Sequence, residues 1–173
     1  MKTPDSRWVQ QAIAEFEEPL IRYAAHITRD VERAREVVQD TFLKLCHQQP
    51  AQVRHLAQWL YTVCRNRALD VLRKERRMTE LSDAQLELQS RSGPDVSTAL
   101  EHEEQLSDIL KVLSTLPANQ QEVIRLKFQA DLSYVEISRI TNLTVSNVGF
   151  LIHTGLKTIR ERVRMQPALR RVK

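Results

Sequence analysis

Two clusters of cationic side chains are the part of this sequence best suited to a chemical task. Lys and Arg bind phosphate oxygens through charge and hydrogen bonds, so two basic segments on one chain indicate two contacts with one polyanion. Residues 78–110, between the clusters, reverse the sign, with eight acidic residues against Arg91 alone. The cationic residues lie in segments 65–77 and 157–173: Arg65, Arg67, Arg73, Lys74, Arg76, Arg77, Lys157, Arg160, Arg162, Arg164, Arg170, Arg171 and Lys173.

The second cluster follows a pattern of two helices joined by a tight turn, from Leu132 to Arg164. Ser133 is suited to cap the first helix, and Asn142 tolerates the left-handed backbone that a sharp helix end requires. Thr144 is suited to cap the second helix. Three apolar residues of the first helix are predicted to face inward: Val135, Ile137 and Ile140.

The turn predicts a helix-turn-helix. Ser138 supplies the small residue that the crossing of the two helices needs, and Leu143 and Val148 are expected to fill the wedge between them. Such a motif places its second helix in the major groove of DNA. From this pattern alone, an ordinary pair of packed helices with a solvated basic face is the alternative.

Composition favours an all-α protein. The chain of 173 residues is 42% hydrophobic, has only three glycines and shows no sustained strand alternation. No apolar run is long enough to span a bilayer, and the first ten residues lack the apolar core of a signal peptide. We therefore expect a cytoplasmic protein.

The first part of the chain predicts three helical segments. Pro19 falls inside the first apolar stripe and predicts a kinked or broken helix. Asp30 is suited to cap the next helix, and His55 to Arg77 form the longest helical pattern, apolar in its first half and basic in its second. Trp59 and Tyr61 favour core positions over base stacking.

Gly93 and Pro94 interrupt the helical pattern in the acidic segment. We therefore predict two small helical domains, residues 1–77 and 99–173, joined by a flexible acidic linker over residues 78–98. The second domain is expected to begin with an apolar helix that includes Ile109 and Leu110, and to end in the helix-turn-helix.

Catalytic and metal-binding motifs are missing from the sequence. It has no nucleophile elbow, no phosphate-binding loop and no paired ligand motif, which argues against an enzyme. Cys46, His47 and His55 match no familiar zinc spacing, and Cys46 and Cys64 are expected to be reduced core residues. We predict neither a cofactor nor a metal.

Three segments in order resemble the extracytoplasmic-function sigma factors of bacteria. VVQDTFLKL (37–45) resembles their polymerase-binding helix, and WLYTVCRNRALDVLRKERR (59–77) resembles their helix for the minus-10 promoter element. LPANQQEVIRLKFQADLSYVEIS (116–138) resembles the start of their minus-35 domain. The resemblance implies a protein that catalyses nothing itself but binds core RNA polymerase, brings it to promoter DNA and helps to open the duplex.

The resemblance also implies a role for particular residues. The loop 49–55 would lie near a flipped base of the non-template strand. Members of the family often work under an anti-sigma protein, and the sequence identifies none. The implied polymerase-binding residues are Glu36, Gln39, Asp40 and Lys44; the implied DNA-binding residues are Asn66, Arg67, Arg73, Lys74, Arg76, Arg77, Ser146, Asn147, His153 and Lys157.

The second helix of the helix-turn-helix departs from the family pattern, which usually carries Lys or Arg at the positions of Gly149, Leu151, Thr154 and Leu156. Two readings follow. Gly149 could let the backbone approach DNA closely, or Gly149, Phe150, Leu151 and Leu156 could form an apolar surface for a protein partner. The alternative for the whole chain is a stand-alone helix-turn-helix regulator that binds DNA without being a polymerase subunit.

Overall fold

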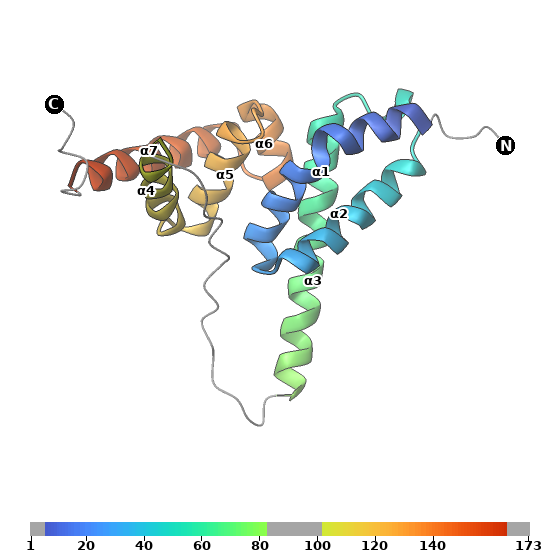
Figure 1. The fold of residues 1–173 in the computed structure, drawn as a ribbon, viewed down its shortest axis with the longest axis horizontal. Helices are drawn as coiled ribbons and strands as arrows, with labels where there is room; N and C mark the ends of the chain where they lie inside the picture. Colours follow the sequence, from blue (N-terminus) through green and yellow to red (C-terminus); the bar gives the residue numbers. More distant parts are fainter. Residues whose placement is uncertain (1–5, 83–101, 166–173) are drawn as a thin grey trace. The chain divides into compact units, whose positions relative to one another are not determined.

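The computed structural model describes residues 6–82 and 102–165, and over these ranges the chain consists of helices and their connecting turns (Figure 1). No strand occurs among the described residues, which agrees with the predicted all-α class. The chain divides into two compact units, Met1–Pro94 and Asp95–Lys173. In the described part of the chain, no helix has the combination of length and apolar character that crossing a membrane requires.

The first unit contains helices α1 (Ser6–Thr28), α2 (Val31–Cys46) and α3 (Leu56–Ser82), with a short 3-10 helix η1 (Pro50–Gln52) before α3. Helices α1 and α2 pack against each other and against the first part of α3, and the last part of α3 projects beyond them (Figure 1). Tyr23 and Tyr61 meet edge to face inside this unit, with ring centroids 5.2 Å apart. The buried apolar side chains include Leu20, Val37, Val38, Leu45, Leu60 and Ala68.

Local sequence determines several of these helix ends. Asp30 caps α2, because its Oδ1 accepts hydrogen bonds from the backbone N–H groups of Glu32 (2.9 Å) and Arg33 (3.1 Å). Pro19 lies inside α1, which stays continuous and bends along its length (Figure 1). Of the two sequence-based alternatives, a kinked helix is therefore the correct one.

Helix α3 extends five residues past the predicted domain boundary at Arg77 and ends at Ser82. The first five residues of the predicted linker, 78–82, are therefore helical. The remaining part of that segment up to residue 98, and the predicted start of the second domain at residue 99, lie outside the described residues.

The second unit contains α4 (His102–Ser114), α5 (Ala118–Phe128), α6 (Tyr134–Thr141) and α7 (Val145–Met165), and α7 packs against the other three helices. Three residues of the apolar runs in α4 and α5 lie at the surface: Ile109, Leu110 and Phe128 are exposed. The inward face of α4 instead carries Val112 and Leu113, and Leu116 is buried just after the end of the helix. One core cluster joins α4, α5 and α7 through Val112, Leu113, Leu116, Ile124 and Ile159.

The helix-turn-helix consists of α6 and α7. Ser133 and Glu136 form a reciprocal capping box at the start of α6, and Asn142 ends it in the left-handed conformation, with φ 58° and ψ 29°. Thr144 Oγ1 accepts a hydrogen bond from the Asn147 N–H, as expected of a cap of α7. Ser138 Oγ donates a hydrogen bond to the Leu143 carbonyl at 2.6 Å, which fixes the turn.

Within α6 the predicted apolar face is partly wrong. Ile137 and Ile140 are buried, whereas Val135 is 47% exposed. Residues 137 and 140 are three positions apart and share a face, and a residue two positions before Ile137 falls on the other side of a 3.6-residue turn. The buried face of α6 is therefore narrower than its run of apolar residues indicates.

Candidate functional site

Helix α2 presents a mostly polar face to solvent. Glu36, Gln39 and Lys44 are exposed and Asp40 is half-buried. Leu43 lies among them and is 55% exposed, so this face has an apolar residue that sequence reasoning did not select. Leu43 follows Gln39 by four residues and Asp40 by three. This spacing is the signal that could have identified it, because residues three and four apart share a helix face.

The structure joins two residues that the family resemblance assigned to different partners. Arg67 Nε donates to Asp40 Oδ2 at 2.7 Å, an ion pair between α3 and α2 in which both side chains remain about two-fifths exposed. Asp40 was assigned to polymerase and Arg67 to DNA. The pair lies at a shallow, open hollow whose lining combines three predicted site residues with three others: Asp40, Lys44, Arg67, Leu43, His47 and Asp70.

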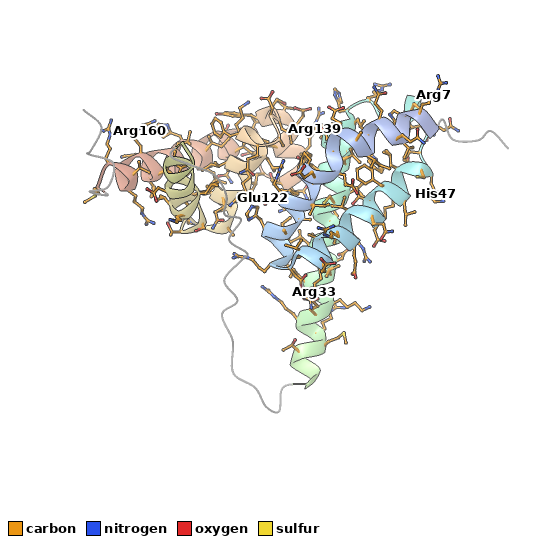
Figure 2. All side chains as sticks on the ribbon, in the orientation of Figure 1. Arg7, Arg33, His47, Glu122, Arg139 and Arg160 are labelled. Carbon is orange, nitrogen blue, oxygen red and sulfur yellow. The ribbon has the colours of Figure 1, made fainter. Side chains whose placement is uncertain are left out.

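A second ion pair ties α2 to α3. Arg33, which extends from α2 in Figure 2, places Nη1 2.6 Å from Glu75 Oε1. Both side chains are partly exposed, so each pair stabilises the fold by about 1 kcal/mol or less. Together the two pairs connect the helix with the polar face to the helix with the basic face at two points along their length.

The basic face of α3 points away from the core of its unit. Asn66, Arg73 and Arg77 follow one another at intervals of seven and four residues and form one line on the helix, and Lys74 lies beside that line. All four are exposed. Arg73 is paired with Asp70 at 2.8 Å, and Arg76 is exposed but falls on the other side of the line. Asn66, Arg73, Lys74 and Arg77 are therefore accessible on one face, with Arg76 exposed beside it.

The loop that precedes α3 is held by one apolar anchor. Val53 is buried, and the backbone N–H of Gln49 meets Gln52 Oε1 at 3.4 Å. The flanking residues Arg54 and His55 are exposed. Of the two aromatic residues that follow, Tyr61 is buried and belongs to the core, as expected, whereas Trp59 is only half-buried.

Helix α7 exposes one stripe opposite its buried side. Ser146, His153 and Lys157 lie on this stripe, seven and four residues apart, and Asn147 lies at its edge. All four predicted residues are exposed. Arg160 is exposed near the end of the same helix (Figure 2). The buried side of the helix carries Val148, Ile152 and Ile159.

The residues of α7 that depart from the family pattern differ in their exposure. Leu151 is buried, Leu156 is half-buried, and an added Cβ at Gly149 would meet the Tyr134 ring of α6 at 3.6 Å. Leu151 therefore points into the core, whereas Gly149 and Leu156, seven residues apart, share one half-buried side of the helix. The four residues do not form one exposed apolar surface. Phe150 is the exposed member of the set, at 64%. Gly155 faces the core, where an added Cβ would lie 2.6 Å from Ile124 Cδ1.

The thiols have no functional arrangement in the described residues. Cys64 is buried and Cys46 is half-buried rather than in the core, and neither forms a disulfide. Burial raises the pKa of Cys64 to about 12, although a hydrogen bond with Thr41 opposes the shift, and burial also raises the pKa of Tyr61 to about 12. Among the described residues, no group of three or more His, Cys, Asp or Glu side chains is arranged to hold a metal ion.

Two family models match the two units separately. Residues 12–78 match sigma-70 region 2, and residues 106–159 match sigma-70 region 4. The chain thus contains the two helical regions of a sigma-70 protein in their usual order, with the polar face of α2 and the basic face of α3 in the first and the helix-turn-helix in the second.

Two similar proteins of known identity are ECF RNA polymerase sigma factors. The ECF RNA polymerase sigma factor SigM of Bacillus subtilis is 27% identical over 146 residues, which cover 82% of this chain and 88% of SigM. SigL of Mycobacterium tuberculosis, another ECF sigma factor, is 28% identical over 147 residues, which cover 82% of this chain and 80% of SigL. The chain belongs to the ECF sigma factors.

A solved structure has the same fold. The sigma factor RpoE from Bartonella quintana, crystallised with the anti-sigma factor NepR, matches with a TM-score of 0.69 at 23% identity over 91% of this chain and 97% of RpoE. As a sigma factor, the protein is a transcription initiation factor that binds core RNA polymerase and directs it to promoters. A stand-alone regulator does not account for the match to region 2.

Proposed function

We propose that the two faces of the first unit have separate tasks, with the α2 face docking on core polymerase and the basic face of α3 holding the minus-10 region of the promoter. The observation that carries the proposal is that the first unit exposes both faces on different helices. Glu36, Gln39 and Lys44 surround the exposed Leu43, an arrangement of apolar centre and polar rim that suits a protein partner.

Asp40 and Arg67 have a dual part in this proposal. Each is assigned to a different partner, yet they are paired in the unbound chain at 2.7 Å. Because both remain partly exposed, the pair costs little to open, about 1 kcal/mol or less. When the pair opens, Asp40 on α2 becomes available to polymerase and Arg67 on α3 becomes available to DNA.

Along α3, four exposed polar or cationic residues, Asn66, Arg73, Lys74 and Arg77, can follow one strand of the promoter. The exposed loop 49–55, anchored by Val53, is proposed to receive a base that has left the stack. Extracting a base costs a few kcal/mol, which the binding of polymerase can offset.

In the second unit we assign the exposed stripe of α7 to the minus-35 element. Ser146 and Asn147 lie at the first turn of the helix, the part that reaches base edges in helix-turn-helix proteins, and His153 and Lys157 lie farther along. Lys157 and the following arginines suit phosphate contacts.

The remaining proposals concern the cellular setting. The protein acts in the cytoplasm, catalyses no reaction itself and is subject to an anti-sigma protein. The last proposal draws on RpoE, which has the same fold as this chain and was crystallised in complex with the anti-sigma factor NepR.

Charge reversal tests the docking face. Glu36→Lys leaves the Asp40–Arg67 pair intact, and we expect it to weaken binding to core polymerase by at least tenfold. Glu17→Lys, an equally exposed change on α1, is the matched control and should bind core as the parent does. Equal binding by all three proteins would show that α2 is not the docking face.

The α3 assignment has an independent test. Lys74→Ala combined with Arg77→Ala should lower the affinity of the holoenzyme for promoter DNA and reduce the slope of log affinity against log salt by about two. Binding to core polymerase should not change. An unaltered slope would place this face away from DNA phosphates.

A further inference from the structure

Phe150 occupies the middle of the exposed stripe of α7. It follows Ser146 by four residues and precedes His153 and Lys157 by three and seven, so the four side chains project from the same side of the helix. The opposite side carries the buried residues Val148 and Ile152. The ring of Phe150 is 64% exposed, so it contributes little to the core of its unit.

The chemistry of the ring limits what it can contact on DNA. A phenyl group neither donates nor accepts a conventional hydrogen bond, so it cannot hold a phosphate or read the polar edge of a base pair. The major groove presents one apolar group, the C5-methyl of thymine, and phenylalanine is among the side chains that contact it.

We infer that Phe150 reads the methyl group of a thymine in the minus-35 element. The inference rests on the proposed assignment of α7 to that element. Four residues of helix advance by about 6 Å, and successive bases on one strand rise by about 3.4 Å. The thymine therefore lies one or two base steps from the base that Ser146 contacts.

The apolar readout fits the scarcity of cations on the first three turns of α7. From Val145 to Gly155 the helix carries no Lys or Arg, and its first cation is Lys157. Contacts with base edges and a methyl group then supply selectivity where phosphate contacts do not. A promoter element that lacks this methyl group should bind less tightly even though its base pairing is unchanged.

Deoxyuridine isolates the methyl group, because it pairs as thymine does and lacks only the C5-methyl. The minus-35 element is first obtained by selecting promoters from a random library with holoenzyme made from the full chain and core polymerase. Each thymine is then replaced singly by deoxyuridine. For the parent holoenzyme we expect one replacement to weaken promoter binding by about fourfold, the factor for one buried methyl group.

The variant Phe150→Ala should bind the thymine promoter at least fourfold more weakly and show no further loss at that deoxyuridine. Phe128→Ala is the matched control, since Phe128 is 60% exposed in the same unit but lies on α5, and it should keep the full sensitivity of the parent. If Phe150→Ala remains as sensitive as the parent at every thymine, or the parent is sensitive at none, the inference is wrong.

A further variant distinguishes the role of Phe150 from the proposed assignment of α7 to the minus-35 element. If Asn147→Ala changes neither affinity nor selectivity for the minus-35 element, the assignment of α7 itself fails. If Asn147→Ala weakens binding while Phe150→Ala behaves as the parent does, only the methyl-reading role of Phe150 fails. A loss of core binding in Phe150→Ala that is independent of the methyl group would identify the residue as a protein contact and contradict the inference.

Discussion

Gly149 and Gly155 lie in the same helix and offer a matched pair of substitutions. Replacing a glycine inside a helix by alanine stabilises the helix by about 0.5–1 kcal/mol, provided that the new methyl group fits. At Gly149 the added Cβ would make an ordinary contact with Tyr134 at 3.6 Å. We therefore expect Gly149→Ala to raise the free energy of unfolding of the second unit by about 0.5–1 kcal/mol.

The same change at Gly155 has the opposite sign. The added Cβ would lie 2.6 Å from Ile124 Cδ1, and Leu116 Cδ1 is 3.5 Å away. Ile124 is itself buried in the cluster with Val112, Leu113, Leu116 and Ile159, so its side chain has little room to move. Overpacking of this kind costs about 1–3 kcal/mol, which exceeds the helix-propensity gain and leaves a net loss of about 1 kcal/mol.

Two optical signals measure this difference. Both tryptophans, Trp8 and Trp59, lie in the first unit, so tryptophan fluorescence follows that unit, whereas far-ultraviolet circular dichroism follows the helices of both. In urea unfolding, the two variants should differ by about 1–3 kcal/mol in the circular dichroism transition and not in the fluorescence transition. If Gly155→Ala is as stable as Gly149→Ala, the assignment of Gly155 to a close helix contact is wrong.

Three further predictions concern stability. Tyr61 and Cys64 titrate near 10.0 and 9.0 in an unfolded chain, and burial raises both pKa values to about 12 in the folded one. The unfolded state therefore loses these protons at a lower pH than the folded state does. The stability that they contribute to the first unit is complete below about pH 9 and should fall as the pH rises toward 12. Urea unfolding followed by tryptophan fluorescence at pH 7 to 11 measures this, and a constant midpoint would contradict it. At Asn142 φ is 58°, a left-handed conformation that glycine adopts readily and valine does not. Asn142→Gly should therefore keep the thermal midpoint of the second unit, and Asn142→Val should lower its free energy of unfolding by about 1–2 kcal/mol. Equal midpoints for the two variants would refute the role of the left-handed turn. A double-mutant cycle on Asp40 and Arg67 should give a coupling free energy of about 1 kcal/mol or less, and a value of several kcal/mol would mean that the pair is a structural requirement.

Local signals account for what the sequence predicted well. Asp30, Ser133, Asn142 and Thr144 were identified as helix ends because a cap depends on a residue and the backbone two or three positions away. The structure has all four in these places. The order of polar and basic helices likewise depends only on residues near one another in the chain.

Contacts between distant segments account for what the sequence did not predict. A side chain at position 155 would collide with Ile124 on another helix, which explains the glycine there. The Asp40–Arg67 pair joins residues 27 positions apart in the sequence. Neither periodicity nor motif spacing contains that information. The exposure of Ile109 and Leu110 shows a related limit, since an apolar run indicates a helix without indicating which of its apolar positions faces the core.

Promoter-dependent transcription by a reconstituted holoenzyme tests the central claim most directly. Core RNA polymerase is mixed with the full chain and with a selected promoter, and specific transcripts from the start site are counted with and without the protein. We expect transcripts only when the protein is present, and fewer with Glu36→Lys than with Glu17→Lys. Transcription that is equally strong without the protein, or DNA binding that needs no polymerase and gives no transcript, would contradict the account.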